Sequence, residues 1–209
     1  MSRRNWNTQE KNGQRLVVCL FTSRNKDNEG VENFKERRKS FLAYEGSPHI
    51  EREFKHFVED GAPGETSRWY ESLNARDPEK AKKQLMIHLI EKDDASEIAH
   101  LNSVIVSIAA KKECAAEKKW LIDFDSCDDF LLASFIYDVK EQMNEDCKRS
   151  KKHLNEDPEI TAKKTPNGYA VITPYGFYSQ EILKHYECAE LKKDGMLFMD
   201  IRKNDGKKE

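Results

Sequence analysis

The sequence predicts an α+β fold, with a mixed, mostly antiparallel sheet and flanking helices. Two short turn segments, Pro166-Asn167-Gly168 and Lys193-Asp194-Gly195, each separate runs of strand-forming residues, which is typical of antiparallel hairpins. The helical patterns gather in the middle of the chain instead of alternating regularly with strands. No glycine-rich phosphate loop follows any strand, which argues against dinucleotide-binding and P-loop folds.

The N-terminal half, residues 1–110, begins with one apolar, partly β-branched run at 15–22 that predicts a buried strand. Apolar residues between 31 and 42 fit a loose helical spacing, and those between 50 and 58 do so again. Aromatic residues without helix signals predict a strand over 66–74. Two helices are expected next, one starting at Asp77-Pro78 with an N-cap carboxylate and one over 96–110.

The C-terminal half, residues 111–203, carries most of the predicted strands. Trp120–Asp125 is the first strand, and Asp128 and Asp129 are expected to cap a helix over 130–139. A short helix is expected at 179–186. The two predicted hairpins pair 160–165 with 169–173, and 187–192 with 196–202. With a flexible tail at 204–209, we interpret the chain as one α+β domain over 1–209.

Composition narrows the class of protein. Charged residues make up 35% of the 209 residues but nearly cancel to a net charge of −2, so contact with nucleic acid needs a local basic patch. No apolar run is long enough for a signal peptide or a membrane span. The five cysteines are widely spaced, without a Cys-x-x-Cys motif, which argues against disulfides and structural zinc. The sequence therefore predicts a cytoplasmic protein without membrane contact.

Paired carboxylates at a strand end are the main chemical signal. Asp123 and Asp125 follow the apolar residues of the Trp120–Asp125 strand, and period-two alternation puts both on one face. Because two like charges repel, folding alone gains nothing from this pair, whereas Mg²⁺ or Mn²⁺ would offset the repulsion. The alternative is a strand end with exposed acids, one of which caps the next helix. We expect the strand at 196–202 to lie beside Trp120–Asp125 in one sheet, which would make Asp200, an acid in an otherwise apolar strand, a third ligand.

These motifs resemble the archaeo-eukaryotic primase (primase-polymerase) superfamily over about residues 100 to 203. That family has an Asp-x-Asp pair on one strand, then a Ser-x-His motif, then a single Asp on a later strand. Asp123 with Asp125 matches the first element, Gly168-Tyr169-Ala170 lies at the second, and Asp200 matches the third. The resemblance implies a primase-like palm and metal-dependent nucleotidyl or phosphoryl transfer on nucleotides or nucleic acid. The expected catalytic residues and metal ligands are Asp123, Asp125 and Asp200.

The resemblance also implies a nucleotide- or phosphate-binding hairpin formed by Lys164, Thr165, Gly168 and Tyr169. The chain departs from the family where Ala170 replaces the histidine. One alternative is therefore a catalytically silent derivative that binds nucleic acid or a protein partner. The small size and high charge suit a phage-encoded protein.

Two further hypotheses complete the sequence reading. The segment 121–126 also resembles the nucleophile strand of haloacid-dehalogenase-like phosphohydrolases, which need a long parallel sheet after it. Separately, Arg68, Trp69 and Arg76 combine basic and aromatic side chains of the kind that hold nucleic acid. The competing interpretation of that segment is a strand in which Trp69 packs inward.

Overall fold

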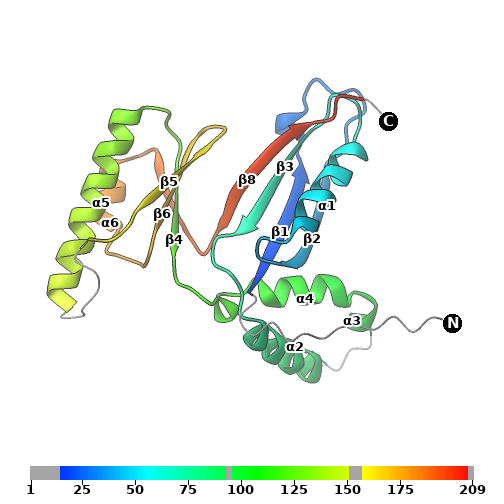
Figure 1. Ribbon diagram of the computed structural model, residues 1–209, viewed down its shortest axis with the longest axis horizontal. Helices are drawn as coiled ribbons and strands as arrows, with labels where there is room; N and C mark the ends of the chain where they lie inside the picture. Colours follow the sequence, from blue (N-terminus) through cyan, green and yellow to red (C-terminus); the bar gives the residue numbers. More distant parts are fainter. Residues whose placement is uncertain (1–14, 93–95, 151–156, 207–209) are drawn as a thin grey trace.

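Two four-stranded antiparallel sheets form the body of the molecule (Figure 1). The computed structural model describes residues 15–92, 96–150 and 157–206. The predicted α+β class is confirmed, although the strands divide between two sheets with separate hydrophobic cores. We call these sheet A and sheet B.

Sheet A has the strand order β2-β1-β3-β8. Its strands are β1 (Leu16–Ser23), β2 (Arg37–Tyr44), β3 (Thr66–Ser72) and β8 (Met196–Lys203). Helix α1 (Pro48–Glu59) covers one face, where the rings of Phe21 and Phe54 lie 5.1 Å apart. The apolar spacing that predicts α1 is confirmed, because its inward side chains fill this core.

The expected helix within residues 31–42 is wrong, because its second half, residues 37–42, forms part of β2. The whole of β2 pairs with β1, from Leu16 opposite Tyr44 to Ser23 opposite Arg37. Phe41 and Ala43, two residues apart, both pack into the core under α1. Pairing with a buried neighbouring strand therefore decides the structure where the local spacing is weak.

Sheet B has the strand order β5-β6-β4-β7 and lies at the other end of the molecule. Its strands are β4 (Trp120–Phe124), β5 (Thr161–Thr165), β6 (Gly168–Thr173) and β7 (Ala189–Lys193). Helices α5 (Asp129–Ser150) and α6 (Gln180–His185) cover its outer face. As expected, the carboxylate of Asp128 caps α5, accepting hydrogen bonds from the N–H groups of Phe130 and Leu131 at 2.9 and 3.1 Å.

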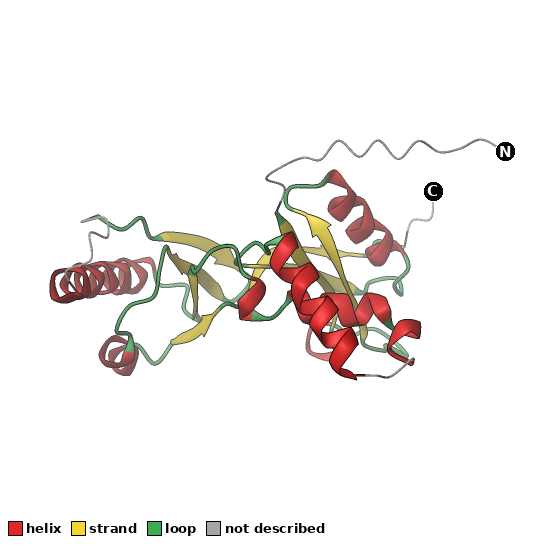
Figure 2. Ribbon diagram, turned by 90° about the horizontal axis from the view of Figure 1, so that it is seen from below, coloured by secondary structure: helices red, strands yellow, loops and turns green. Residues whose placement is uncertain are grey.

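A group of helices packs beside sheet A, at the far end from α5 (Figure 2). It comprises α2 (Pro78–Lys92), α3 (Ser96–Ala99) and α4 (Leu101–Ala109), followed by the short 3-10 turn η2 (Lys112–Cys114). A second 3-10 turn, η1 (Asn25–Asp27), follows β1 at the other end of sheet A. The predicted cap of α2 is confirmed, because Asp77 accepts from the N–H of Glu79 at 2.9 Å. No helix in the described part of the chain combines the length and apolar character needed to cross a bilayer.

The two predicted hairpins have different outcomes. The first is confirmed: β5 and β6 pair antiparallel, with Pro166 and Asn167 between them. The second is wrong, because β7 pairs with β4 in sheet B while β8 pairs with β3 in sheet A. The turn Lys193-Asp194-Gly195 therefore carries the chain from one sheet to the other.

A buried polar cluster anchors this crossing. The Arg76 side chain, 2% exposed, donates to both carboxylate oxygens of Asp194 at 2.7 and 3.1 Å. The Asn74 amide donates to Oδ1 of the same carboxylate, which Arg76 also contacts, and to the carbonyl of Lys119, each at 3.0 Å. Arg76 and Asn74 follow β3 of sheet A, whereas Lys119 leads into β4, so the cluster links the segments that join the two sheets.

Candidate functional site

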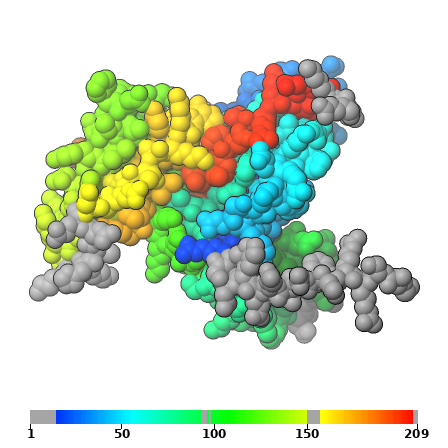
Figure 3. All heavy atoms as spheres, in the orientation of Figure 1, coloured from blue at the N-terminus to red at the C-terminus, as the bar shows by residue number. Residues whose placement is uncertain are grey.

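A groove of about 350 Å³ lies between the two sheets. We call it the inter-sheet groove. Its charged lining residues come from both sides: Arg24, Lys26, Arg68, Asp123, Asp125, Lys192. Figure 3 shows the β5–β6 hairpin (yellow) beside β8 (red). At this contact the ammonium of Lys163 lies 3.5 Å from the sulfur of Met199. The crossing turn through Gly195 also contributes to the lining.

The paired carboxylates line the sheet B wall of the groove. Asp123 lies within β4, and Asp125 follows the strand, held by a hydrogen bond from its N–H to the carbonyl of Cys188 at 2.7 Å. Burial raises the pKa of the Asp123 carboxyl, and the nearby charge of Asp125 raises it further, against a smaller opposing effect of Lys192. The pair is therefore electrostatically costly in the absence of a bound cation.

The β5–β6 hairpin completes this wall. Ala170 lies directly opposite Asp123 in the β4–β6 ladder, and both side chains line the groove together with Thr165. Gly168 lies against β4, because a Cβ there would come within 2.1 Å of the Phe124 carbonyl oxygen. Gly168 has no positive φ, so close backbone approach rather than turn geometry requires a glycine at this position.

Two arginines and two aromatic rings face the acids from the sheet A side. Arg68 is 8% exposed and its guanidinium bonds to Asp27 at 2.5 Å, while Arg24 bonds to the other oxygen of the same carboxylate at 2.9 Å. One carboxylate thus holds both guanidinium groups at the edge of the groove. The rings of Tyr70 and Phe198, 5.8 Å apart, line the groove beside them.

The expectation that Trp120–Asp125 and 196–202 are neighbouring strands is wrong, and Asp200 is not among the groove-lining residues. A β-bulge in β8 is the reason. Tyr70 pairs with Phe198, but Trp69 pairs with Asp200, so Met199 is an extra residue. Asp200 therefore shares the α1 face with Trp69, where it accepts from Arg202 at 2.7 Å.

Several other residues expected at a site are engaged elsewhere. Tyr169 lies on the α5 side of sheet B and donates to Asp129 at 2.5 Å, and its cross-strand partner Lys164 shares that face. The ring of Trp69 packs on Phe54, with 5.7 Å between centroids. Arg76 is buried in its ion pair with Asp194. Of the basic and aromatic set proposed for nucleic acid, only Arg68 lines the groove.

Sequence reasoning missed the groove residues Arg24 and Lys26. Arg24 and Lys26 directly follow the apolar strand β1, just as Asp125 directly follows β4. Polar residues immediately after buried strands are the available signal, for these cations as for the acids. Their meeting with Asp123 depends on how the two sheets face each other, which no local pattern encodes.

The donor set fits a hard divalent cation that also binds a ligand phosphate. Mg²⁺ commonly takes one or two carboxylates from the protein and completes its shell with water and phosphate oxygens, and Asp123 with Asp125 supplies two. Within residues 15–92, 96–150 and 157–206, no group of three or more His, Cys, Asp or Glu side chains is arranged to hold a metal. Any metal site in this groove would therefore be incomplete without the ligand.

Comparison with known proteins finds no matching family model, no matching curated protein and no matching solved structure. The strand directions in sheet B argue against the haloacid-dehalogenase-like alternative. Both neighbours of β4 are antiparallel to it, whereas a haloacid-dehalogenase-like phosphohydrolase needs parallel strands beside its nucleophile strand. The groove is therefore interpreted from its own chemistry.

Proposed function

We propose that the inter-sheet groove binds a nucleoside triphosphate together with Mg²⁺ or Mn²⁺, and that the chain catalyses primase-like nucleotidyl transfer. The observation that carries this proposal is the opposition of Asp123 and Asp125 on one wall to Arg24 and Arg68 on the other. Carboxylates bind the cation, and guanidinium groups bind phosphate oxygens. Tyr70 and Phe198 offer aromatic surfaces for a base.

Position 170 agrees with the primase-like motif in its location but departs from it in residue type. The family carries a phosphate-binding histidine where this chain has Ala170, and Ala170 lies opposite Asp123 on the groove wall. The same observation favours a second candidate, a protein that binds nucleotide without transferring it. Under both, Arg24 and Arg68 orient the phosphates, and a bound divalent cation would supply charge neutralisation at the phosphoryl group.

Calorimetric titration with Mn²⁺, with and without a nucleoside triphosphate, tests the proposal. We expect Mn²⁺ binding to strengthen when nucleotide is present, because the described residues of the groove supply two carboxylates, Asp123 and Asp125. Asp125→Asn should abolish that coupling while leaving the protein equally or more stable, since it removes one of two crowded charges. Asp200→Asn is the matched control, because Asp200 lies on the α1 face, and it should retain the coupling. Equal losses in both variants, or no coupling in the wild type, would contradict the proposal.

A primer-extension assay separates the two candidates. An enzyme incorporates nucleotides with Mn²⁺ and loses this activity in Asp125→Asn. A silent binder shows the calorimetric coupling without incorporation, and Ala170→His then tests whether the histidine is what transfer lacks. Activity that survives Asp125→Asn would exclude a catalytic role for the acids.

A further inference from the structure

A buried carboxylate connects the two arginines of the inter-sheet groove. Asp27, the last residue of η1, accepts from the Nε of Arg24 at 2.9 Å and from the guanidinium of Arg68 at 2.5 Å, one on each oxygen. The Asp27 side chain is 9% exposed. Burial alone would raise the pKa of Asp27, but the hydrogen bonds from Arg24 and Arg68 outweigh it and hold the pKa below its ordinary value. We call Arg24, Asp27 and Arg68 the arginine clamp.

The neighbouring Asn28 fixes the turn that carries the clamp. Its side-chain amide donates to the carbonyl of Arg24 at 2.9 Å and to the carbonyl of Thr66 at 3.0 Å. Its side-chain oxygen accepts from the N–H of Thr66 at 2.6 Å. Thr66 begins β3, the strand that carries Arg68, and Asn28 is 3% exposed. The turn that holds Arg24 and Asp27 is therefore tied to the strand that holds Arg68.

Folding alone does not favour an arginine at position 68. Arg68 is 8% exposed, and its Nε is buried without a hydrogen-bond partner among the described residues. A buried donor that stays unpaired costs free energy, which a smaller uncharged side chain in β3 would avoid. Arg68 nevertheless lines the groove. A cation kept at such a cost beside an open groove points to an anionic ligand.

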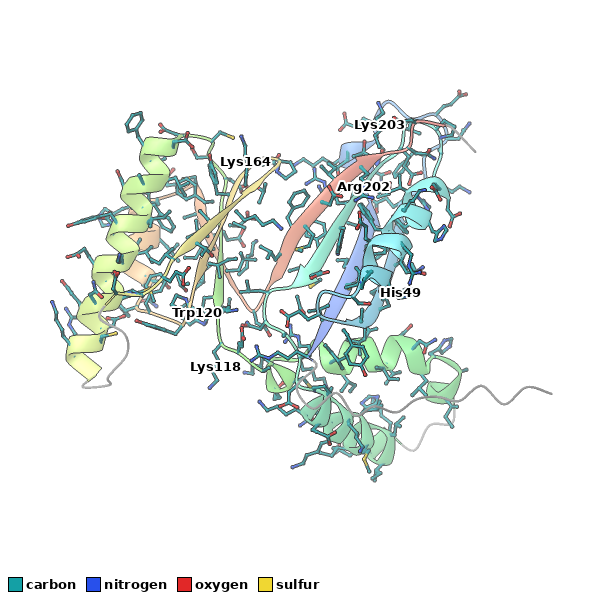
Figure 4. The ribbon with its side chains drawn as sticks, in the orientation of Figure 1. His49, Lys118, Trp120, Lys164, Arg202 and Lys203 are labelled. Carbon is teal, nitrogen blue, oxygen red and sulfur yellow. The ribbon has the colours of Figure 1, made fainter. Side chains whose placement is uncertain are left out.

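The charges on the sheet A wall of the groove leave an excess that such a ligand would neutralise. Arg24, Lys26 and Arg68 carry three positive charges, and Asp27 offsets one, which leaves two. Lys26 is exposed and has no ion-pair partner within residues 15–92, 96–150 and 157–206. Figure 4 shows side chains of the two sheets directed toward each other between β4 and β8, beside the hairpin that Lys164 marks. The cationic wall therefore faces the wall that carries the acids.

We propose that Asp27 is a positioning residue that orients Arg24 and Arg68 to hold the terminal phosphates of the nucleotide. This inference rests on the proposed nucleotide binding in the groove and adds a requirement for more than one phosphate group. Because Asp123 and Asp125 lie on the opposite wall, one phosphate group lies at their cation while the next lies at the clamp. Simple charge attraction predicts the opposite role for Asp27, since removing an anion from the groove would then strengthen phosphate binding.

Calorimetric titration in the presence of Mn²⁺ compares adenosine triphosphate with adenosine monophosphate. The wild type should bind the triphosphate at least about tenfold more tightly than the monophosphate. Asp27→Asn should weaken triphosphate binding about tenfold and change monophosphate binding less than about threefold, although it makes the groove more positive. A loss of folded protein would lower both affinities by the same factor, so their ratio reports the orientation of the clamp. Stronger triphosphate binding by Asp27→Asn, or an unchanged ratio, would overturn the proposal.

Arg24→Gln keeps the test decisive if Asp27→Asn does not fold. The Arg24 side chain is 37% exposed, and Arg68 keeps its bond to Asp27 in this variant. Arg24→Gln should therefore fold and should lower the preference for triphosphate. Arg52→Gln, which removes an exposed arginine from α1, is the matched control and should keep the wild-type ratio. Equal ratios in these two variants would overturn the proposal.

The wild-type titrations distinguish failure of the clamp from failure of the proposed function. A wild type that binds neither nucleotide with Mn²⁺ would contradict nucleotide binding in the groove, and the role of Asp27 would fall with it. A wild type that binds both nucleotides equally, with the coupling between Mn²⁺ and nucleotide intact, would overturn the clamp alone.

Discussion

The two turns of the C-terminal half look alike in sequence and differ in what they connect. Pro166 and Asn167 join β5 to β6 within sheet B, whereas Lys193-Asp194-Gly195 passes from β7 in sheet B to β8 in sheet A. The first turn is stabilised by the ladder on both sides of it. The second has no such ladder, and the buried contact of Asp194 with Arg76 takes its place.

This difference shows which features of the fold local sequence signals can predict and which they cannot. Turn residues between two strand-forming runs predict a reversal of the chain, but they do not determine whether the two strands pair with each other. At the second turn, the two flanking strands pair with different partners: β7 pairs with β4, and β8 pairs with β3. The groove exists because this second hairpin does not form.

The largest expected effect is at the crossing turn. Asp194→Ala leaves the guanidinium of Arg76 buried without its counter-ion, and we expect a loss of about 3–5 kcal/mol of unfolding free energy in urea denaturation. Asp157→Ala removes an exposed acid paired with Lys140 and serves as the control, with a change inside experimental error. Similar small effects for both would show that the turn does not depend on the buried pair.

The next effect is at the hairpin. Gly168→Ala places a Cβ against the Phe124 carbonyl, and because backbone cannot yield as a flexible side chain does, we expect a loss of about 2–3 kcal/mol. Gly30→Ala is the matched control, since nothing lies within 4 Å of its Cβ position. Thermal or urea unfolding of both variants measures the difference. A hairpin that tolerates the methyl group would mean that β6 moves freely relative to β4.

An ion pair inside one sheet sharpens the contrast with Asp194. Burial alone would raise the pKa of Glu65, but the N–H of Ala62 and the Arg37 guanidinium outweigh it and hold the pKa below its ordinary value of 4.5. The stabilisation is therefore present above pH 4.5 and is lost as the pH falls through the lower folded-state pKa. Glu65→Gln should cost about 1–2 kcal/mol near pH 7.

The pH dependence provides the check on that variant. Urea midpoints of wild type and Glu65→Gln should converge as the pH falls below 4.5, because the wild-type carboxyl is then increasingly protonated. A constant difference across this range would show that side-chain shape, not charge, accounts for the effect.

The smallest expected effect is again at the crossing turn. Lys193→Gly relieves the positive φ and should raise stability by about 0.5–1 kcal/mol, because glycine adopts this conformation without strain. Calorimetric melting of the variant measures it. A decrease would show that the ammonium over Trp120 contributes more than the strain costs.

The elements that sequence reasoning predicted well are those with strong local chemistry. The Asp77 and Asp128 caps, the apolar face of α1 and the β5–β6 turn each depend on contacts within a few residues. The site is different. Asp123 and Asp125 were found from the strand that carries them, but their cationic partners Arg24 and Arg68 come from a sheet whose orientation no local pattern specifies.

The β-bulge at Met199 has a consequence for how this strand is compared with others. In a regular strand, odd and even positions keep their sides throughout, so position 200 would share the side of position 198. One inserted residue reverses that parity, and Phe198 and Met199 both turn toward sheet B while Asp200 turns away. The groove therefore meets Phe198 and not Asp200, so the spacing of an acid along this part of the chain does not tell which side of the sheet carries it.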